Sequence, residues 1–382
     1  MFHARCLFGV CLTAFTLAAS APAAEPTDSL ALVDVFVNGQ EGYPAFRIPS
    51  LLAAKHGTLL AFAEGRAHLR DHAENDIVLK RSADGGKTWG PLQLVHEDGA
   101  NSLGNPAAVI VRETGRVLLM YQRYAKGFDE HKAEPGLDGP RICRTFTQHS
   151  NDDGVTWSKP VEITAQVKRP TEVTSTATGP GIGIQLIRGK HAGRILMPFN
   201  QGPYGKWKVY AAMSDDGGKS WRYGETAPEG AAGYANEVQF VELNDGSVML
   251  NARNQAGGEK VRKVSISRDG GETWSTTRHD PALIEPVCQA SILRHPGHSD
   301  AAKDVFLFCN PATQTGRTNG MIRLSRDEGA TWTVSRVLYP GGFAYSCLAS
   351  LPDRSVGCLF ERDGYKAISF ARFTVSWVEG TE

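Results

Sequence analysis

Short runs in which apolar and polar residues alternate follow one another along most of this chain. The first four runs span residues 31–39, 45–54, 57–66 and 76–82. A period of two is typical of β-strands that have one buried face. Turn-forming residues such as Gly57 separate consecutive runs, which favours hairpins over long crossovers. The pattern therefore predicts three or four antiparallel strands in this first part of the chain.

Similar alternating runs recur along the chain, and a repeated eight-residue phrase accompanies them. The phrase reads S-x-D-x-G-x-[TS]-W, and its five copies begin at intervals of 53 to 68 residues, at Ser82, Ser150, Ser214, Ser267 and Ser325. Its aspartate can accept hydrogen bonds around a turn, its glycine permits a positive φ, and its tryptophan can pin the turn against its own sheet. Each phrase is therefore predicted to join two strands of a hairpin. A repeat of this size is typical of arrays of similar supersecondary units.

Six such units can be counted, because strand-like runs follow the first unit at residues 105–123, 181–200, 237–254, 290–312 and 347–378. We therefore predict an all-β fold, a six-bladed β-propeller of four-stranded antiparallel blades. The N-terminal run at residues 31–39 is expected to complete the last blade, which would remove open sheet edges. Residues 124–141 break the pattern and are interpreted as a long surface loop.

Residues 1–24 resemble a secretory signal peptide, with a polar, positive start, a short apolar core and small residues before Ala24. We expect cleavage near Ala23 or Ala24, a single propeller domain over residues 25–382, and a secreted or periplasmic bacterial protein. A disordered N-terminus is the alternative. The apolar core is too short for a membrane-spanning helix, and no second apolar run of membrane length follows.

Composition narrows the choice of partners and cofactors. The 41 Lys and Arg residues balance the 41 Asp and Glu residues, which argues against nucleic-acid or anionic-membrane binding. The cysteines beyond the signal show no CxxC spacing, so neither a disulfide framework nor a zinc site is expected. Most should be small buried residues. Cys347 and Cys358 lie in neighbouring strand-like runs and could pair.

Charged residues interrupt the apolar runs in several units. Arg47 lies inside an apolar run, Arg253 ends another, and Arg317 shortly precedes a third. Three guanidiniums that converge at the centre of a propeller would form a clamp for a carboxylate, because each is a rigid bidentate donor. A solvated surface charge is the alternative for each arginine. Four further polar residues near strand ends are candidates for the same site, Asp71, Glu237, Tyr345 and Glu361. The alternatives are packing for the tyrosine, solvent exposure for the glutamates and a turn or cap role for the aspartate.

The tetrapeptide FRIP at residues 46–49, together with the five turn phrases, resembles the sialidase (neuraminidase) family, where these phrases are called Asp boxes. The resemblance extends over about residues 30–378. It implies that the three arginines bind the substrate carboxylate and that Glu361 orients Arg47. Arg323 is the alternative to Arg317. Asn105 and Arg66 are implied to lie near the pocket, with Arg66 on its glycerol or acyl side.

For catalysis, the resemblance implies Tyr345 as nucleophile, Glu237 as its base and Asp71 as acid/base, with Asp76 as the less favoured alternative to Asp71. Sialic acid carries a carboxylate on its anomeric carbon, which would repel a carboxylate nucleophile, whereas a free tyrosine is neutral. The resemblance implies a retaining reaction without a metal or an organic cofactor.

The predicted activity is that of a secreted exo-α-sialidase, which acts on terminal sialic acids of glycoproteins, glycolipids and oligosaccharides. Within the enzymes, the alternatives are a hydrolase of a deaminated or other nonulosonic acid and a trans-sialidase. A catalytically silent sialic-acid-binding propeller is the alternative outside the enzymes. All expected site positions are filled, which argues against that last alternative.

Overall fold

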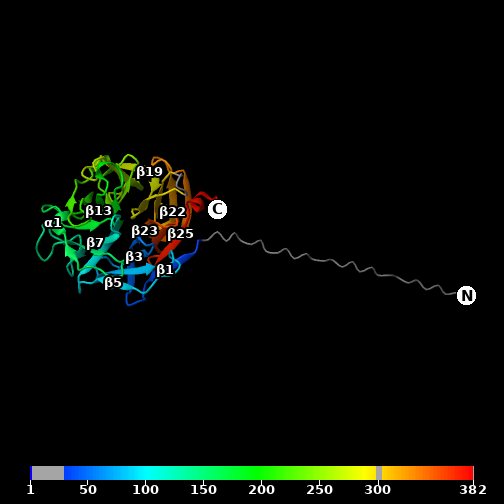
Figure 1. Cartoon of the computed structure of the whole chain (residues 1–382), viewed down its shortest axis with the longest axis horizontal. Helices are drawn as coiled ribbons and strands as arrows, with labels where there is room; N and C mark the ends of the chain where they lie inside the picture. Colours follow the sequence, from blue (N-terminus) through cyan, green and yellow to red (C-terminus); the bar gives the residue numbers. More distant parts are fainter. Residues whose placement is uncertain (2–29, 298–302, 382) are drawn as a thin grey trace.

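The computed structural model describes residue 1, residues 30–297 and residues 303–381. The predicted signal peptide therefore lies, apart from Met1, outside the described residues. Nearly all regular structure is β (Figure 1), and the prediction of an all-β fold is confirmed. Helical turns in the described part of the chain are short, at α1 (Thr164–Val167), η1 (Gly189–His191), η2 (Gly230–Ala232) and α2 (Val375–Glu379).

Strands between residues 45 and 182 form a nine-stranded sheet, which contains two antiparallel groups. The first group contains β2 (Ala45–Ala53), β3 (Leu59–Arg66), β4 (Asn75–Ser82) and β5 (Gln93–His96). The second contains β6 (Ser102–Val111), β7 (Arg116–Tyr124), β8 (Arg144–Ser150) and β9 (Val161–Glu162). A single parallel bridge between Asn75 and Ser102 joins the groups, and β11 (Gly181–Ile182) pairs with β6.

Two smaller sheets follow along the chain. The five-stranded sheet contains β10 (Thr176–Thr178), β12 (Ile184–Gln185), β13 (Ile195–Gln201), β14 (Lys208–Ser214) and β15 (Arg222–Tyr223). The four-stranded sheet contains β16 (Asn236–Glu242), β17 (Val248–Arg253), β18 (Val261–Ser267) and β19 (Arg278–Ile284). Both are antiparallel throughout.

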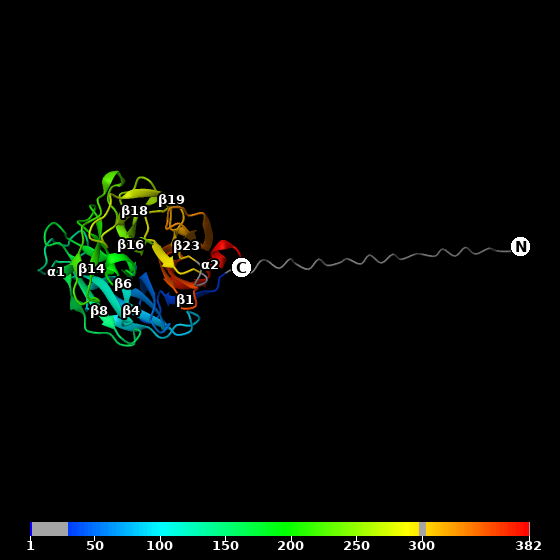
Figure 2. The same ribbon diagram turned by 45° about the horizontal axis from the view of Figure 1, so that its top comes forward.

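The C-terminal part forms a seven-stranded sheet with the first strand of the chain. Its members are β20 (Ser291–His295), β21 (Val305–Pro311), β22 (Thr318–Ser325), β23 (Val334–Ser350), β24 (Val356–Arg362), β25 (Ala367–Phe373) and β1 (Leu32–Val37). The expected pairing of the N-terminal strand with the C-terminal unit is confirmed, because β1 pairs antiparallel with β25. Figures 1 and 2 show the blue β1 beside the red end of the chain.

The described strands thus form four hydrogen-bonded sheets, where six separate four-stranded sheets were expected. Two local features couple neighbouring groups. The 17-residue strand β23 pairs with β22 through its first half and with β24 through its second half. The bridge between Asn75 and Ser102 couples the two N-terminal groups. Neither a long strand that serves two groups nor a single bridge can be read from two-residue periodicity.

The five repeated phrases form turns with the expected hydrogen bonds. In the first phrase, Asp84 Oδ1 accepts a bond from the Thr88 amide and Ser82 Oγ accepts one from the Gly86 amide, both at 2.9 Å. Equivalent bonds recur in the other four phrases. Gly86 has φ +90°, and a Cβ there would lie 2.1 Å from the Phe370 ring. Glycine is therefore required at this position by both backbone and space.

The tryptophans of these phrases do not all pack as expected. Trp274 contacts Phe240 and Trp332 contacts Phe308, each within its own strand group. Trp157, in contrast, meets Phe62 of the preceding group edge-on, with the ring centroids 5.7 Å apart. The expectation that each tryptophan pins its turn to its own sheet therefore holds for only part of the set.

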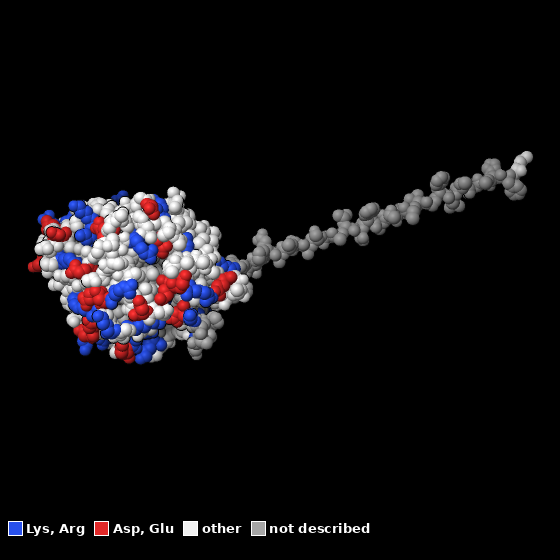
Figure 3. Space-filling model, turned by 90° about the horizontal axis from the view of Figure 1, so that it is seen from above, with Lys and Arg blue, Asp and Glu red and all other residues white. Residues whose placement is uncertain are grey.

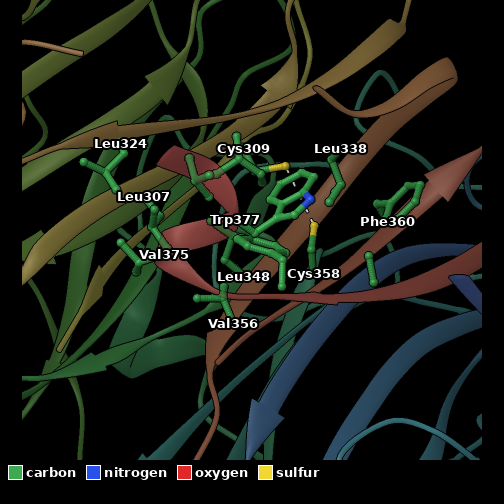
Figure 4. Packing of buried hydrophobic residues seen from close by; sticks show 14 of the residues in the cluster. Leu307, Cys309, Leu324, Leu338, Leu348, Val356, Cys358, Phe360, Val375 and Trp377 are labelled. Carbon is green, nitrogen blue, oxygen red and sulfur yellow. Dashed lines mark hydrogen bonds between the residues drawn. The ribbon is translucent and has the colours of Figure 1, made fainter. Parts of the chain in front are cut away.

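All five cysteines of the described chain are buried and free, as expected for small apolar residues. The alternative that Cys347 pairs with Cys358 is not borne out. In the register between β23 and β24, Cys358 lies opposite Leu348, so Cys347 and Cys358 point to opposite faces of the sheet. Figure 4 shows Cys358 instead next to Cys309, with the sulfur atoms 3.8 Å apart near Trp377.

The surface is consistent with the balanced composition. Figure 3 shows Lys and Arg intermingled with Asp and Glu on the displayed face, without a large area of one sign. None of the described helices is long and apolar enough to cross a bilayer.

Candidate active site

A polar cleft brings together residues that are far apart in the sequence. Arg47 reaches it from β2, Glu64 and Arg66 from β3, Glu237 from β16 and Tyr345 from β23. Asp71 and Asn105, also expected near the pocket, contribute to its walls. These strands belong to three different sheets, so the tertiary fold alone creates the cleft.

Irregular strand pairing places four of these residues. The register shifts in β2 between Arg47 and Ser50, in β16 next to Glu237, in β23 around Tyr345, and in β6 at Asn105. Glu237 and Asn105 themselves have positive φ angles of 36° and 51°. A β-bulge re-aims a side chain that regular alternation would send to one face of the sheet. The bulges therefore direct polar groups of apolar strands into the cleft.

The centre of the site is a contact between three side chains. The Tyr345 hydroxyl donates a hydrogen bond to Glu237 Oε1. Arg253 Nη1 donates to the other carboxylate oxygen of Glu237 at 2.7 Å and to the Tyr345 hydroxyl at 3.1 Å. The phenol thus has a proton acceptor and a positive charge within hydrogen-bonding distance. This arrangement can activate a nucleophilic oxygen.

The electrostatics of Tyr345 favour the neutral phenol in the unliganded protein. Burial raises the pKa of Tyr345 well above its usual value, and the negative charge of Glu237 raises it further. The guanidiniums of Arg253, Arg317 and Arg47 act in the opposite direction. The phenol can therefore ionise only if its proton moves to a nearby base at the moment of reaction.

Arg47 is fixed by a buried carboxylate. Its Nε and Nη2 donate to the two oxygens of Glu361 at 3.0 and 3.1 Å. Glu361 is fully buried, and it also accepts bonds from the amides of Ile48 and Tyr345. One carboxylate thereby holds both the arginine and the backbone of Tyr345. This is the contact that the sequence resemblance implied for Glu361.

Arg317 completes the group of arginines. Its Cζ lies 5.5 Å from the centroid of the Tyr345 ring, and the Cζ of Arg47 lies 5.0 Å from the same centroid. Arg317 Nη1 donates to the Tyr365 hydroxyl at 2.9 Å, and Nη2 donates to the Val287 carbonyl. The alternative, Arg323, instead donates to Asn310 within its own sheet. The structure therefore brings Arg317, and not Arg323, to Tyr345.

Asp71 lies at the exposed side of the cleft, with 64% of its side chain accessible. Its Oδ1 accepts a bond from Arg66 Nη1 at 2.8 Å and lies 3.6 Å from Arg47 Nη1. Partial desolvation opposes its ionisation, but the charges of these two arginines hold the pKa of Asp71 below its usual value. The alternative, Asp76, does not line the cleft and accepts a bond from the Tyr43 hydroxyl at 2.7 Å.

A buried carboxylate that the sequence interpretation missed connects the two remaining predicted residues. Glu64 accepts bonds from Arg66 Nε and from the Asn105 amide, both at 2.6 Å. Burial raises the pKa of Glu64, although Arg66 and the amide bond oppose that shift. Arg66 therefore joins Glu64 to Asp71. A glutamate inside the apolar run of residues 57–66 was the available signal.

A second missed pair comes from the segment interpreted as a surface loop. Glu130 of that loop lines the cleft, and its Oε2 lies 2.6 Å from His72 Nε2. His72 follows Asp71 directly in the sequence, and its ring meets Tyr124 edge-on. The loop thus forms part of the cleft wall, which its irregular sequence did not indicate. No group of His, Cys, Asp and Glu that could hold a metal ion occurs in the described residues.

Comparisons with known proteins agree with these features. The family model of the BNR repeat-like domain matches residues 57–358. The chain is 37% identical over 359 residues to a sialidase of Micromonospora viridifaciens, a match covering 91% of this chain and 54% of that protein. It is 30% identical to an exo-alpha-sialidase of Aspergillus fumigatus over 375 residues, which cover 88% of this chain and 86% of the fungal protein.

A solved structure described as the Hadza microbial sialidase Hz136 has the same fold, with a TM-score of 0.82 and 31% sequence identity. The match covers 90% of this chain and 68% of that one. This chain spans about half the length of the Micromonospora relative, and 61% of a Bacteroides fragilis sialidase to which it is 33% identical.

Proposed function

Because this chain belongs to the sialidase family, we propose that it is an exo-α-sialidase that hydrolyses terminal α-ketosidically linked sialic acids. The substrates would be sialylated glycoproteins, glycolipids and oligosaccharides. The observation that carries the proposal is the contact of the Tyr345 hydroxyl with both Glu237 and Arg253, where Tyr345 and Glu237 line the cleft. No metal or organic cofactor takes part in the proposed reaction.

The three arginines bind the carboxylate of the sugar. Arg47 and Arg253 each have a carboxylate partner, Glu361 and Glu237, whereas Arg317 donates to neutral oxygens. The cluster therefore keeps a net positive charge close to the Tyr345 ring. Guanidiniums bind carboxylates through paired N–H donors, which also fixes the orientation of the sugar.

In the first step, the Tyr345 oxygen attacks the anomeric carbon while its proton passes to Glu237. The glycosidic C–O bond breaks, and Asp71 gives its proton to the leaving oxygen. Asp71 must therefore be protonated when the substrate is bound. The substrate carboxylate reduces the positive charge around Asp71, which favours its protonation. The product of this step is a covalent glycosyl-enzyme, an aryl ketoside in which the anomeric carbon is bonded to the Tyr345 oxygen.

In the second step, Asp71 takes a proton from a water molecule, and the water oxygen attacks the anomeric carbon. The bond to Tyr345 breaks, and Glu237 returns the proton to the phenolate. Two displacements at one carbon restore its configuration, so the proposed reaction is retaining.

The strand groups and the N-terminus support two further proposals. Six groups of antiparallel strands, β2–β5, β6–β9, β10 with β13–β15, β16–β19, β20–β23 and β23–β25 with β1, support a six-bladed propeller. The composition of residues 1–24 supports export through a signal peptide to the periplasm or the medium. N-terminal sequencing of the exported protein would locate the cleavage site.

A direct assay tests the proposed function. The purified full chain is incubated with the 4-methylumbelliferyl glycosides of N-acetylneuraminic acid and of its deaminated analogue. Faster release of 4-methylumbelliferone from the N-acetylneuraminic acid glycoside supports the sialidase. Faster release from the deaminated analogue supports a hydrolase of that sugar. No release from either substrate refutes hydrolysis. Addition of lactose as an acceptor, with product analysis, distinguishes hydrolysis from transfer.

A further inference from the structure

We infer that Tyr365 is a positioning residue, which fixes Arg47 and Arg317 in the orientation needed to bind the substrate carboxylate. The inference rests on the proposed function, since it concerns the arginines that are proposed to bind the substrate carboxylate. Tyr365 lies in the turn between β24 and β25, four residues after Glu361. It is not one of the residues that the sequence resemblance implied.

The first argument is the contact with Arg317. Among the described residues, Arg317 pairs with no carboxylate, and its one side-chain hydrogen-bond partner is the Tyr365 hydroxyl, which accepts a bond from Nη1 at 2.9 Å. A phenol oxygen is a neutral acceptor, so it fixes the guanidinium without cancelling its charge. A carboxylate in this place would neutralise the cation that the substrate must meet. Tyr365 therefore orients Arg317 and leaves its charge available.

The second argument is the contact with Arg47. The Cζ of Arg47 lies 4.3 Å from the centroid of the Tyr365 ring, so the guanidinium is stacked on the aromatic face. Glu361 holds the same guanidinium through its Nε and Nη2 edge. One hairpin thus restrains Arg47 at two points, through the hydrogen bonds to Glu361 and through the ring of Tyr365. The remaining Nη1 group faces the side of Asp71, at 3.6 Å.

The third argument is that Tyr365 is itself held in place. Its φ angle is 71°, a conformation that a bulky residue rarely adopts. Asn38 Nδ2 donates to the Tyr365 carbonyl at 2.7 Å, while Asn38 Oδ1 accepts a bond from the Phe46 amide, next to Arg47. Asn38 therefore ties the backbone of Tyr365 to the strand that carries Arg47. Strained backbone persists where its surroundings determine it closely, as they do here.

The test compares two substitutions at Tyr365 with a matched control. Tyr365→Phe removes the hydroxyl that fixes Arg317 but retains the ring over Arg47, whereas Tyr365→Leu removes both. Tyr339→Phe is the control, because the Tyr339 hydroxyl donates to Asp363 of the same turn, whereas the Tyr365 hydroxyl accepts from Arg317. For the aryl sialoside, we expect KM to rise about 3- to 10-fold in Tyr365→Phe, with kcat within about threefold. Tyr365→Leu should raise KM further, and Tyr339→Phe should match the wild type.

A binding measurement separates positioning from a purely structural role. Calorimetry with 2,3-didehydro-N-acetylneuraminic acid and with its carboxamide compares a ligand that needs the arginines with one that lacks the negative charge. Loss of affinity in Tyr365→Phe for the acid alone supports the inference. Equal loss for both ligands, or kinetics identical to those of Tyr339→Phe, overturns it. If the wild type neither cleaves sialosides nor binds the acid, the proposed function itself fails, which is a distinct outcome.

Discussion

The Tyr345 hydroxyl donates a hydrogen bond to Glu237, although the two residues lie 108 positions apart in the sequence and on strands of different sheets. Arg253 contacts both partners and closes the triangle. Each member restrains the other two, so the proton donor, its acceptor and the neighbouring charge form one geometric unit. The predictions on catalysis follow from this unit.

Replacement of Tyr345 by Phe should remove the proposed nucleophile and leave the arginines in place. We expect kcat for the aryl sialoside to fall about 10³-fold or more, with a smaller change in KM. Incubation of the wild type with a 2,3-difluoro sialic acid, followed by peptide mass spectrometry, should place the label on Tyr345. A label on another residue would refute the assignment. Tyr121→Phe, at a buried tyrosine outside the cleft, serves as the control and should retain activity.

Glu237→Gln should remove the proposed base and also the negative partner of Arg253. We expect kcat to fall about 10²- to 10⁴-fold, the range attributed to a positioned general base. Glu242→Gln is a matched control, since Glu242 is another buried, ion-paired carboxylate of β16 and pairs with Arg188 away from the cleft. Similar losses of activity in the two variants would show that β16 needs its carboxylates for stability, and the role proposed for Glu237 would be wrong.

Asp71→Asn should affect substrates according to their leaving group. An aryl leaving group needs little protonation, so the rate of the first step with the aryl sialoside should change little. The rate of sialic acid release from 3′-sialyllactose should fall about 10²-fold or more. Rates with both substrates, measured side by side, check this expectation. Asp76→Asn is the control and tests the alternative assignment at once. If Asp76→Asn lost natural-substrate activity and Asp71→Asn did not, the two roles would have to be exchanged.

The pair formed by His72 and Glu130 should make the stability of the cleft wall depend on pH. Burial lowers the pKa of His72, but the hydrogen bond and the charge of Glu130 outweigh burial, and the pKa is raised overall. A raised histidine pKa stabilises the fold below the unfolded pKa of about 6.5, and this contribution is lost as pH rises through the folded value. We expect His72→Gln to lower the free energy of unfolding by about 1 kcal/mol at acidic pH and by less at alkaline pH.

Urea titrations at three pH values, from acidic to alkaline, would measure this difference. His68→Gln, at an exposed histidine of the same connection, is the matched control and should show no such trend. A larger effect of His72→Gln at alkaline pH than at acidic pH would contradict the predicted sign. Because His72 directly follows Asp71, the pH profile of kcat in His72→Gln would also report whether the pair positions the acid/base.

Sequence intervals identified the contacts at the centre of the site but not how the backbone aims them. Arg47, Glu237 and Tyr345 could be chosen because polar residues interrupted apolar runs at spacings that resemble one family. The bulges that turn them into the cleft have no such signature, since a register shift depends on the partner strand. Arg66 was placed near the pocket, but its contacts with Glu64 and Asp71 depend on tertiary structure.

The missed residues have a common physical explanation. Glu64 belongs to a strand whose other side chains are mostly apolar, and only its burial next to Arg66 makes it part of the site. Glu130 lies in an irregular segment, where periodicity carries no information on which residues face inward. Tyr365 owes its place to a positive φ that a tyrosine rarely adopts. In each case, a contact between distant segments makes the residue part of the site. A pattern within one segment cannot show such a contact.

The pairing of β1 with β25 bears on the stage of synthesis at which the proposed active site can form. When translation reaches Tyr345, all three arginines, Glu237 and Asp71 have already been synthesised. Glu361, which anchors Arg47, and the last strand, which joins to the first, are still missing at that stage. The nascent polypeptide therefore carries its reactive groups before it can hold them in position. The proposed active site can therefore form only after β25 has been synthesised and has paired with β1.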